Sequence, residues 1–178
     1  MTLDQRHKSA DKITPPYPLP HVSRRALARV KNPLPPPDTC PYCDSNVDLI
    51  THKEKYGRSY GNWPFLYACR YCDAYVGLHP DTDIPLGTLA DHQLREARKA
   101  AKARFHDLMR MNGFTRNEAY RWLKDAMGID KKYCHFGWFN IDRCMQAERL
   151  CVDAISDAQA SQDTLSGQLA RLIKEGRL

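Results

Sequence analysis

Four of the seven cysteines in this chain fall into two Cys-x-x-Cys pairs, one in "TCPYCDSNVD" and one in "ACRYCDAYVG". A Cys-x-x-Cys turn directs two sulfur atoms toward one point, and two such turns complete a tetrahedral metal site of four thiolates. The 25 residues between the inner cysteines give room for a β-hairpin that brings the two turns together. The spacing therefore predicts one structural zinc ion, with the ligands Cys40, Cys43, Cys69 and Cys72.

Other uses of these cysteines fit the pattern less well. Disulfides would leave an odd thiol among seven cysteines, and a redox pair is typically a lone Cys-x-x-Cys at a helix start in a thioredoxin-like frame. A catalytic zinc keeps an open position for water, which four thiolates do not leave. Reduced or metal-bound sulfur also favours a cytoplasmic location.

A second metal site is a weaker hypothesis that the sequence leaves open. Cys134, His135, Cys144 and Cys151 lie within 18 residues of one another. Cys144 and Cys151 share one face of an expected helix, and cysteines of this kind are common in helical cores. We expect these residues to pack rather than to bind metal.

The first part of the chain, residues 1–38, has the composition of a flexible, disordered leader. Two proline-rich pieces, "TPPYPLP" and "NPLPPPD", flank the basic segment "SRRALARVK", which is either a solvated linker or a short helix formed on a partner. Residues 1–39 hold seven Lys/Arg against three Asp/Glu, so most of the net charge of +6 lies there. The chain has no apolar run of about 18 residues and no secretory signal, so no membrane partner is expected.

Residues 39–84 are expected to form the zinc ribbon. The runs "VDLITH", "FLYACR" and "AYVGL" are rich in β-branched and aromatic residues and predict three short strands. A segment of this size buries too little apolar surface to fold without a staple. That shortage is a physical reason for a metal ion in the ribbon.

Residues 85–178 have helical periodicity and are expected to form a helical domain. One helix is predicted between the N-cap Asp91 and Gly113, and a second opens with Thr115 and Glu118 at capping-box spacing. A third is expected after Asn140. A fourth, weaker helix is expected within "DTLSGQLARLIKEGRL", which Gly167 interrupts. The predicted fold class is α+β: a small four-cysteine zinc ribbon packed on three or four helices.

Several motifs resemble a zinc-finger-containing family of unknown function found in bacteria and their phages. The resemblance rests on "CDAYVGLHPDTDIPLGTLADHQLREAR", "TRNEAYRWLKDAMGI" and "HFGWFNIDRC", and extends from about Thr39 to about Cys151. It implies that Cys40, Cys43, Cys69 and Cys72 match the presumed zinc ligands of the family. It supports the metal and the two-part architecture and implies no assigned activity.

The chain departs from this family in the first long helix. Family members tend to carry His-x-x-Phe-Asp there, and the corresponding positions around Phe105 are Lys102 and His106. The departure weakens an enzymatic interpretation. "PLGTLA" lacks the Gly-Lys-Ser/Thr sequence of a phosphate loop, and no Ser-His-Asp set stands out. We therefore expect a protein that is not an enzyme.

Basic and aromatic residues suggest a nucleic-acid-binding surface. Four basic residues recur at i, i+3, i+4 and i+7 along the first long helix, and two more accompany aromatic residues in the ribbon. The residues predicted to contact DNA or RNA are Arg58, Arg70, Arg95, Arg98, Lys99 and Lys102. A solvated helix face and packing of Trp63, Phe65 and Tyr67 are the plainer interpretations of the same pattern.

Two functions follow from these observations. The first is a zinc-stabilised, nucleic-acid-associated or transcription-associated binding module. The alternative is a phage protein-interaction factor that binds and modulates a host protein, or a protein of the transcription machinery, through the ribbon aromatics and the proline-rich leader.

Overall fold

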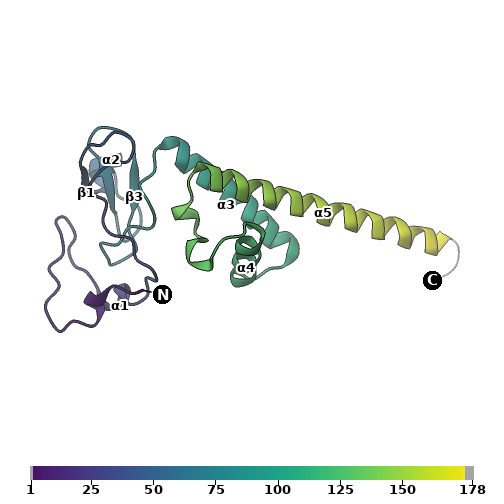
Figure 1. Cartoon of the computed structure of the whole chain (residues 1–178), viewed down its shortest axis with the longest axis horizontal. Coiled ribbons are helices and arrows are strands. Elements are labelled where there is room, and N and C mark those ends of the chain that lie inside the picture. Colours follow the sequence, from purple (N-terminus) through teal and green to yellow (C-terminus); the bar gives the residue numbers. More distant parts are fainter. Residues whose placement is uncertain (1, 175–178) are drawn as a thin grey trace. The chain divides into compact units, whose positions relative to one another are not determined.

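A computed structural model of the chain describes residues 2–174, with the side chains of residues 2–162 and 164. Over these residues the backbone forms a three-stranded sheet, five α-helices and three short 3-10 helices (Figure 1). The expected α+β class is confirmed. The chain divides into two compact units, residues 1–96 with 135–138 and residues 97–134 with 139–178.

The sheet consists of β1 (Val47–Thr51), β2 (Phe65–Cys69) and β3 (Tyr75–Gly77), paired antiparallel in that order. Each strand lies within one of the three runs that predict strands. The central strand β2 is buried at all five positions. The alternate β2 residues Phe65, Tyr67 and Cys69 belong to a hydrophobic core of the first unit, together with Ala74, Val76, Leu78 and Leu89. This burial explains why aromatic and β-branched residues dominate the strands.

A short helix, α2 (His52–Tyr56), follows β1 directly and was not anticipated from the sequence. Its N-terminus carries a capping box, in which the Glu54 backbone N–H donates to the Thr51 hydroxyl and the Glu54 carboxylate accepts from the Thr51 N–H. Gly57 ends the helix with φ +75°, in the left-handed region that favours glycine. The Thr-x-x-Glu spacing was a usable signal for this helix.

The leader forms two short helices, η1 (Gln5–His7) and α1 (Arg24–Leu27). The Arg6 guanidinium contacts the buried Asp83 carboxylate through two hydrogen bonds of 2.7 and 2.8 Å. The backbone N–H of Ser23, the N-cap of α1, donates to the Asp81 carbonyl at 2.8 Å. Both contacts connect the leader to the loop that follows β3.

Apolar residues of the leader are also buried. Leu27 and Val30 pack with Ile84 in a small cluster, and Leu19 joins the core of the ribbon. This differs from the expectation of a flexible, solvated leader. The reason is that Leu27 and Val30 find an apolar partner in the loop that follows β3, which composition alone does not reveal.

Helix α3 (His92–Asn112) begins after Asp91, whose carboxylate accepts from the Leu94 N–H at 2.8 Å. It ends before Gly113, which has φ +63°. Helix α4 (Arg116–Ala126) opens with the predicted capping box of Thr115 and Glu118. All three local signals are confirmed, because caps depend on residues three positions apart.

The last helix, α5 (Ile141–Lys174), starts after Asn140, whose side chain accepts from the Arg143 N–H at 3.0 Å. Two 3-10 helices, η2 (Lys131–Tyr133) and η3 (Phe136–Trp138), precede it. The segment expected to form a separate fourth helix instead continues α5, the third expected helix, as far as Lys174. Residues 175–178 of the expected fourth helix lie outside the described residues.

The segment "PLGTLA" belongs to the ribbon unit, whereas a boundary was expected at residue 85. Isolated β-bridges join Leu78 to Pro85 and Tyr75 to Ala90, so the turn into α3 continues the sheet. A Cβ on Gly87 would lie 2.1 Å from the Gly137 carbonyl oxygen. The Thr88 N–H donates to that same oxygen at 2.9 Å. Glycine is required at position 87 because two backbone segments meet there.

Within the described residues, no helix combines the length and the apolar composition needed to cross a membrane.

Candidate metal centre

The four predicted ligands converge in the ribbon unit. The sulfur atoms of Cys40, Cys43, Cys69 and Cys72 all lie within 4.8 Å of one another. The Cys40–Cys72 and Cys43–Cys69 sulfur pairs are each 3.4 Å apart. A disulfide would bring two sulfurs to about 2.05 Å, so the cluster consists of four free thiols or thiolates.

The first metal turn is shaped by hydrogen bonds within its own backbone. The Asp44 N–H donates to the Cys40 carbonyl at 2.9 Å, and the Cys40 N–H donates to the Ser45 carbonyl at 2.8 Å. Thr39 and Asn46 then form an isolated bridge that closes the loop just before β1. These bonds place both sulfurs of the first pair on the same side of the turn.

The second metal turn begins at the end of β2. The backbone N–H groups of Tyr71 and Cys72 both lie 3.4 Å from the Cys69 sulfur, toward which they donate. The register of the sheet pairs Val47 with Cys69, which brings the second turn beside the first. The expected hairpin is therefore the device that assembles the site.

The electrostatic environment differs among the four thiols. Hydrogen bonds from Ser45 lower the pKa of Cys43 to about 6. Desolvation raises the pKa of Cys40, and it raises the pKa of Cys72 to about 12. A bound zinc ion compensates for such a penalty because its charge deprotonates the coordinating thiols.

The donor set fits zinc by chemistry and by distance. Four thiolates at about 2.3 Å from a tetrahedral zinc ion would lie about 3.8 Å apart, which falls between the observed 3.4 Å contacts and the 4.8 Å limit. Three of the four cysteines also belong to the apolar core or pack against it. The arrangement is a closed, structural site that joins the two turns to the sheet.

The three remaining cysteines do not extend this site. Cys134, Cys144 and Cys151 belong to the helical unit and are all buried. Among the described residues, the ribbon cysteines form the one group of three or more metal-ligating side chains close enough to share an ion. Burial raises the pKa of Cys134 to about 11 and that of Cys151 to about 12. These thiols behave as small apolar core residues.

The two ribbon arginines predicted to bind nucleic acid have different surroundings. The Arg58 guanidinium lies over the Tyr60 ring, 4.8 Å from its centroid, and donates to its hydroxyl. Arg70 forms an exposed ion pair with Asp48, with an Nη2–Oδ1 distance of 2.8 Å. Arg58 therefore contacts an aromatic side chain, whereas a carboxylate offsets the charge of Arg70.

The basic row on α3 is divided between the units. Arg95 lies in the first unit, where it pairs with Asp73, donates to the Ala90 carbonyl at 2.8 Å and covers the Tyr75 ring at 4.1 Å. Arg98 donates to the Phe139 carbonyl at 3.0 Å within the second unit. Lys99 and Lys102 are exposed. The nucleic-acid role of all six residues stays a prediction.

The aromatic residues of the ribbon separate into a core group and a surface group. Phe65 and Tyr67 are buried, and Trp63 packs against the core and donates from its indole N–H to the Thr82 carbonyl at 2.9 Å. Tyr56 and Tyr60 remain 38% and 45% exposed. Trp63, Phe65 and Tyr67 therefore pack as the plainer interpretation predicts, whereas Tyr56 and Tyr60 remain at the surface.

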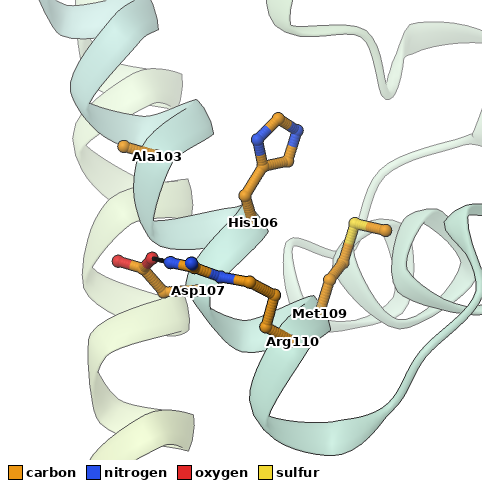
Figure 2. A pocket seen from close by; sticks show the side chains of 5 residues that line it. All are labelled: Ala103, His106, Asp107, Met109 and Arg110. Carbon is orange, nitrogen blue, oxygen red and sulfur yellow. Dashed lines mark hydrogen bonds and ion pairs between the residues drawn. The ribbon is translucent and has the colours of Figure 1, made fainter.

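A shallow hollow in the second unit is lined by Ala103, His106, Asp107, Met109 and Arg110, all from α3. Figure 2 shows that Asp107 points toward Arg110 and that the His106 ring points away from Asp107. The ion pairs with Arg110 and Arg104 lower the pKa of Asp107. The Asp107 carboxylate therefore pairs with arginines. It does not pair with His106, as a carboxylate that orients a histidine general base would.

The fold and the site together define a small α+β protein that is stapled by one structural zinc ion. A family model described as a zinc-finger-containing domain matches residues 36–154. The chain belongs to this family, as the resemblance predicted. Comparisons with curated proteins and with solved structures found no match.

Proposed function

We propose that this chain is a non-enzymatic nucleic-acid-binding module, in which zinc holds the ribbon and the surface around α2 contacts the ligand. The observation that carries the proposal is the alternation of exposed basic and exposed aromatic residues along that surface. These residues are Lys53, Tyr56, Arg58 and Tyr60. Basic residues on phosphates combined with aromatic residues on bases are typical of nucleic-acid-binding surfaces.

The charge balance of this surface supports an anionic ligand. Residues 52–61 contain three basic residues and one acidic residue, Glu54, which is held at the N-terminus of α2 by Thr51. Lys55 contacts Asp73 at 3.3 Å, so Lys53 and Arg58 carry the exposed positive charge. Arg70 and Arg95, by contrast, are offset by carboxylates.

The geometry of the metal centre supports a role without catalysis. Four cysteine sulfurs that share one zinc ion leave no position for a reactive water. The ion's contribution is then to the folding free energy of the ribbon. The ordered sheet in turn holds α2 and the turn between Gly57 and Gly61 at the surface.

A mobility-shift assay with the zinc-loaded full chain tests the proposal. Single-stranded DNA, duplex DNA and RNA are compared at about 50 mM and about 200 mM salt, because phosphate contacts make affinity fall with salt. The double variant Lys53→Gln/Arg58→Gln is expected to bind more weakly and with a shallower salt dependence. The matched control is Lys131→Gln/Lys132→Gln, which removes two exposed lysines of the second unit. Absence of binding to all three nucleic acids at about 50 mM salt would refute the proposal.

A protein partner is the second candidate function, and one observation favours it. Tyr71 lies in the second metal turn and is 87% exposed, and exposed tyrosines frequently anchor protein interfaces. In this case the chain would bind a host protein or a protein of the transcription machinery. A pull-down from bacterial lysate with and without nuclease distinguishes the two functions. Recovery of the same protein after nuclease treatment, and its loss with Tyr71→Ala, would support the second.

A further inference from the structure

Aromatic rings of α2, of the turn that follows it and of β3 form a cluster. The Tyr56 and Tyr60 ring centroids are 5.7 Å apart and the rings meet edge to face at 77°. Tyr56 also meets Tyr75 edge to face at 5.9 Å. The His52 ring lies 5.5 Å from Tyr56 and 6.1 Å from Tyr60. The four aromatic rings thus form a connected cluster around Tyr56, and two of them retain large exposed areas.

The inner ring of this cluster is fixed by charged neighbours. Arg95 covers Tyr75 at 4.1 Å, and the Lys55 ammonium lies 5.3 Å from the same ring. Asp73 pairs with both cations. These contacts anchor Tyr75, and Tyr75 in turn supports Tyr56 from below the exposed surface.

The outer part of the cluster, Tyr60, lies in a turn between two glycines. Gly57 and Gly61 have φ values of +75° and +67°, and a Cβ at either position would meet nothing within 4 Å. Both ends of the turn are therefore open to solvent, and Arg58, Ser59 and Tyr60 between them are exposed. The turn carries Arg58 and Tyr60, and the arginine lies over the tyrosine ring at 4.8 Å. A guanidinium in this position can reach a phosphate next to a base stacked on the rings.

We propose that Tyr56 and Tyr60 form a stacking platform for unpaired bases, so that the ligand of this module is single-stranded nucleic acid. The proposal rests on the proposed function and narrows it. Stacking on an exposed tyrosine ring stabilises binding only when the ring reaches the face of a base. In a duplex those faces are covered by neighbouring base pairs. Duplex DNA would offer this surface phosphates alone, whereas a single strand offers bases and phosphates together.

The test measures the anisotropy of a labelled 20-nucleotide strand and of its duplex with the zinc-loaded full chain. Tyr60→Leu and Tyr56→Leu are each expected to weaken single-strand binding about tenfold and to leave duplex binding nearly unchanged. Tyr60→Phe keeps the ring and is expected to bind like the unaltered chain. Arg58→Gln is expected to reduce the salt slope by about 0.7, the contribution of one phosphate contact on a single strand.

Tyr133 provides a matched control in the second unit. It is 46% exposed and has the Lys132 ammonium 4.8 Å from its ring centroid, close to the values for Tyr60 and Arg58. Tyr133→Leu should change single-strand affinity less than twofold. Zinc content and circular dichroism of each variant establish that the ribbon is intact.

The outcomes separate the platform from the broader proposal. Equal affinity of the unaltered chain for single strand and duplex, or equal effects of Tyr60→Leu and Tyr133→Leu, would overturn the platform while nucleic-acid binding stands. No binding to either probe at about 50 mM salt would overturn both. The first comparison needs no variant, so an unfolded Tyr60→Leu protein would still leave the platform testable.

Discussion

The seven cysteines of this chain are used in two different ways in its two units. In the ribbon, four sulfurs lie within 4.8 Å of one another, and backbone N–H groups donate toward one of them. In the helical unit, Cys134, Cys144 and Cys151 are each buried and form no such group within the described residues. The Cys-x-x-Cys spacing indicates the cysteines that serve as metal ligands. Helical periodicity indicates the cysteines that pack in a core. The comparison shows that a cysteine's neighbours in space decide whether its sulfur serves as a ligand or as packing.

The two groups also differ in how they stabilise their units. The ribbon has three short strands, so a structural metal ion is expected to supply a large part of its stability. The helical unit has a core of large apolar side chains such as Phe105, Leu108, Leu123 and Phe139, each at most 1% exposed. Removal of metal should therefore affect the first unit, and truncation of a core side chain should affect the second.

The largest effect is expected from Cys69→Ser. Loss of one thiolate should reduce the zinc content from about one ion per chain to nearly none, because a three-thiolate site binds far more weakly. Structural zinc contributes on the order of 10 kcal/mol to small domains, so the sheet should lose its protected amides. Elemental analysis and hydrogen exchange measure the two quantities.

Alkylation of the chelated protein sharpens this prediction. Chelator should expose the four ribbon thiols to iodoacetamide, while the helical cysteines stay unreactive because burial protects them and raises the pKa of Cys151 to about 12. Mass spectrometry counts the added groups, and four are expected. Seven modified cysteines would show that the helical unit depends on zinc as well.

A smaller effect is expected from Phe105→Ala in the helical unit. The Phe105 ring is 1% exposed and lies 4.9 Å from the Tyr120 ring, so its loss leaves a cavity in the core. The free energy of unfolding should fall by about 3–5 kcal/mol in a denaturant titration. Zinc content should not change. A Phe105→Ala protein that loses its zinc would contradict the separation between the units.

The smallest effect is expected from Cys151→Ala. If this buried thiol only packs, removal of one sulfur atom should cost about 1 kcal/mol of unfolding free energy. Elemental analysis should still find one zinc ion per chain. A fall in metal content would point to a second site that includes Cys151, the hypothesis that the sequence left open.

The features that were predictable each depend on residues that lie close together in the sequence. The capping box of Thr115 and Glu118, the N-cap Asp91 and the turn at Gly113 each involve residues a few positions apart. Helix α2 has the same kind of signal at Thr51 and Glu54, but the run "VDLITH", which predicts a strand, overlaps its first residue. The zinc ligands were predictable because metal geometry restricts the spacing of each pair.

The parts that were not predictable involve residues far apart in the chain. Asp48 pairs with Arg70 and Asp73 with Arg95, each across 22 residues, so two arginines expected to meet phosphates are offset by carboxylates. The pairing of Arg6 with Asp83 spans 77 residues and anchors a leader expected to be flexible. In a sequence, any acidic residue could pair with any basic one, so the partners are not identifiable. The ion pairs are decided by which charged groups the fold brings close together.

The sequence by itself determined the metal, its four ligands, the three strands and the starts of the main helices, because thiolate geometry and backbone hydrogen bonds act over a few residues. The tertiary structure alone decided which charges are offset, which tyrosines remain exposed, and that Gly87 must be glycine where Gly137 approaches it. These features depend on contacts of a few ångströms between distant segments. Such contacts exist only after the backbone has folded.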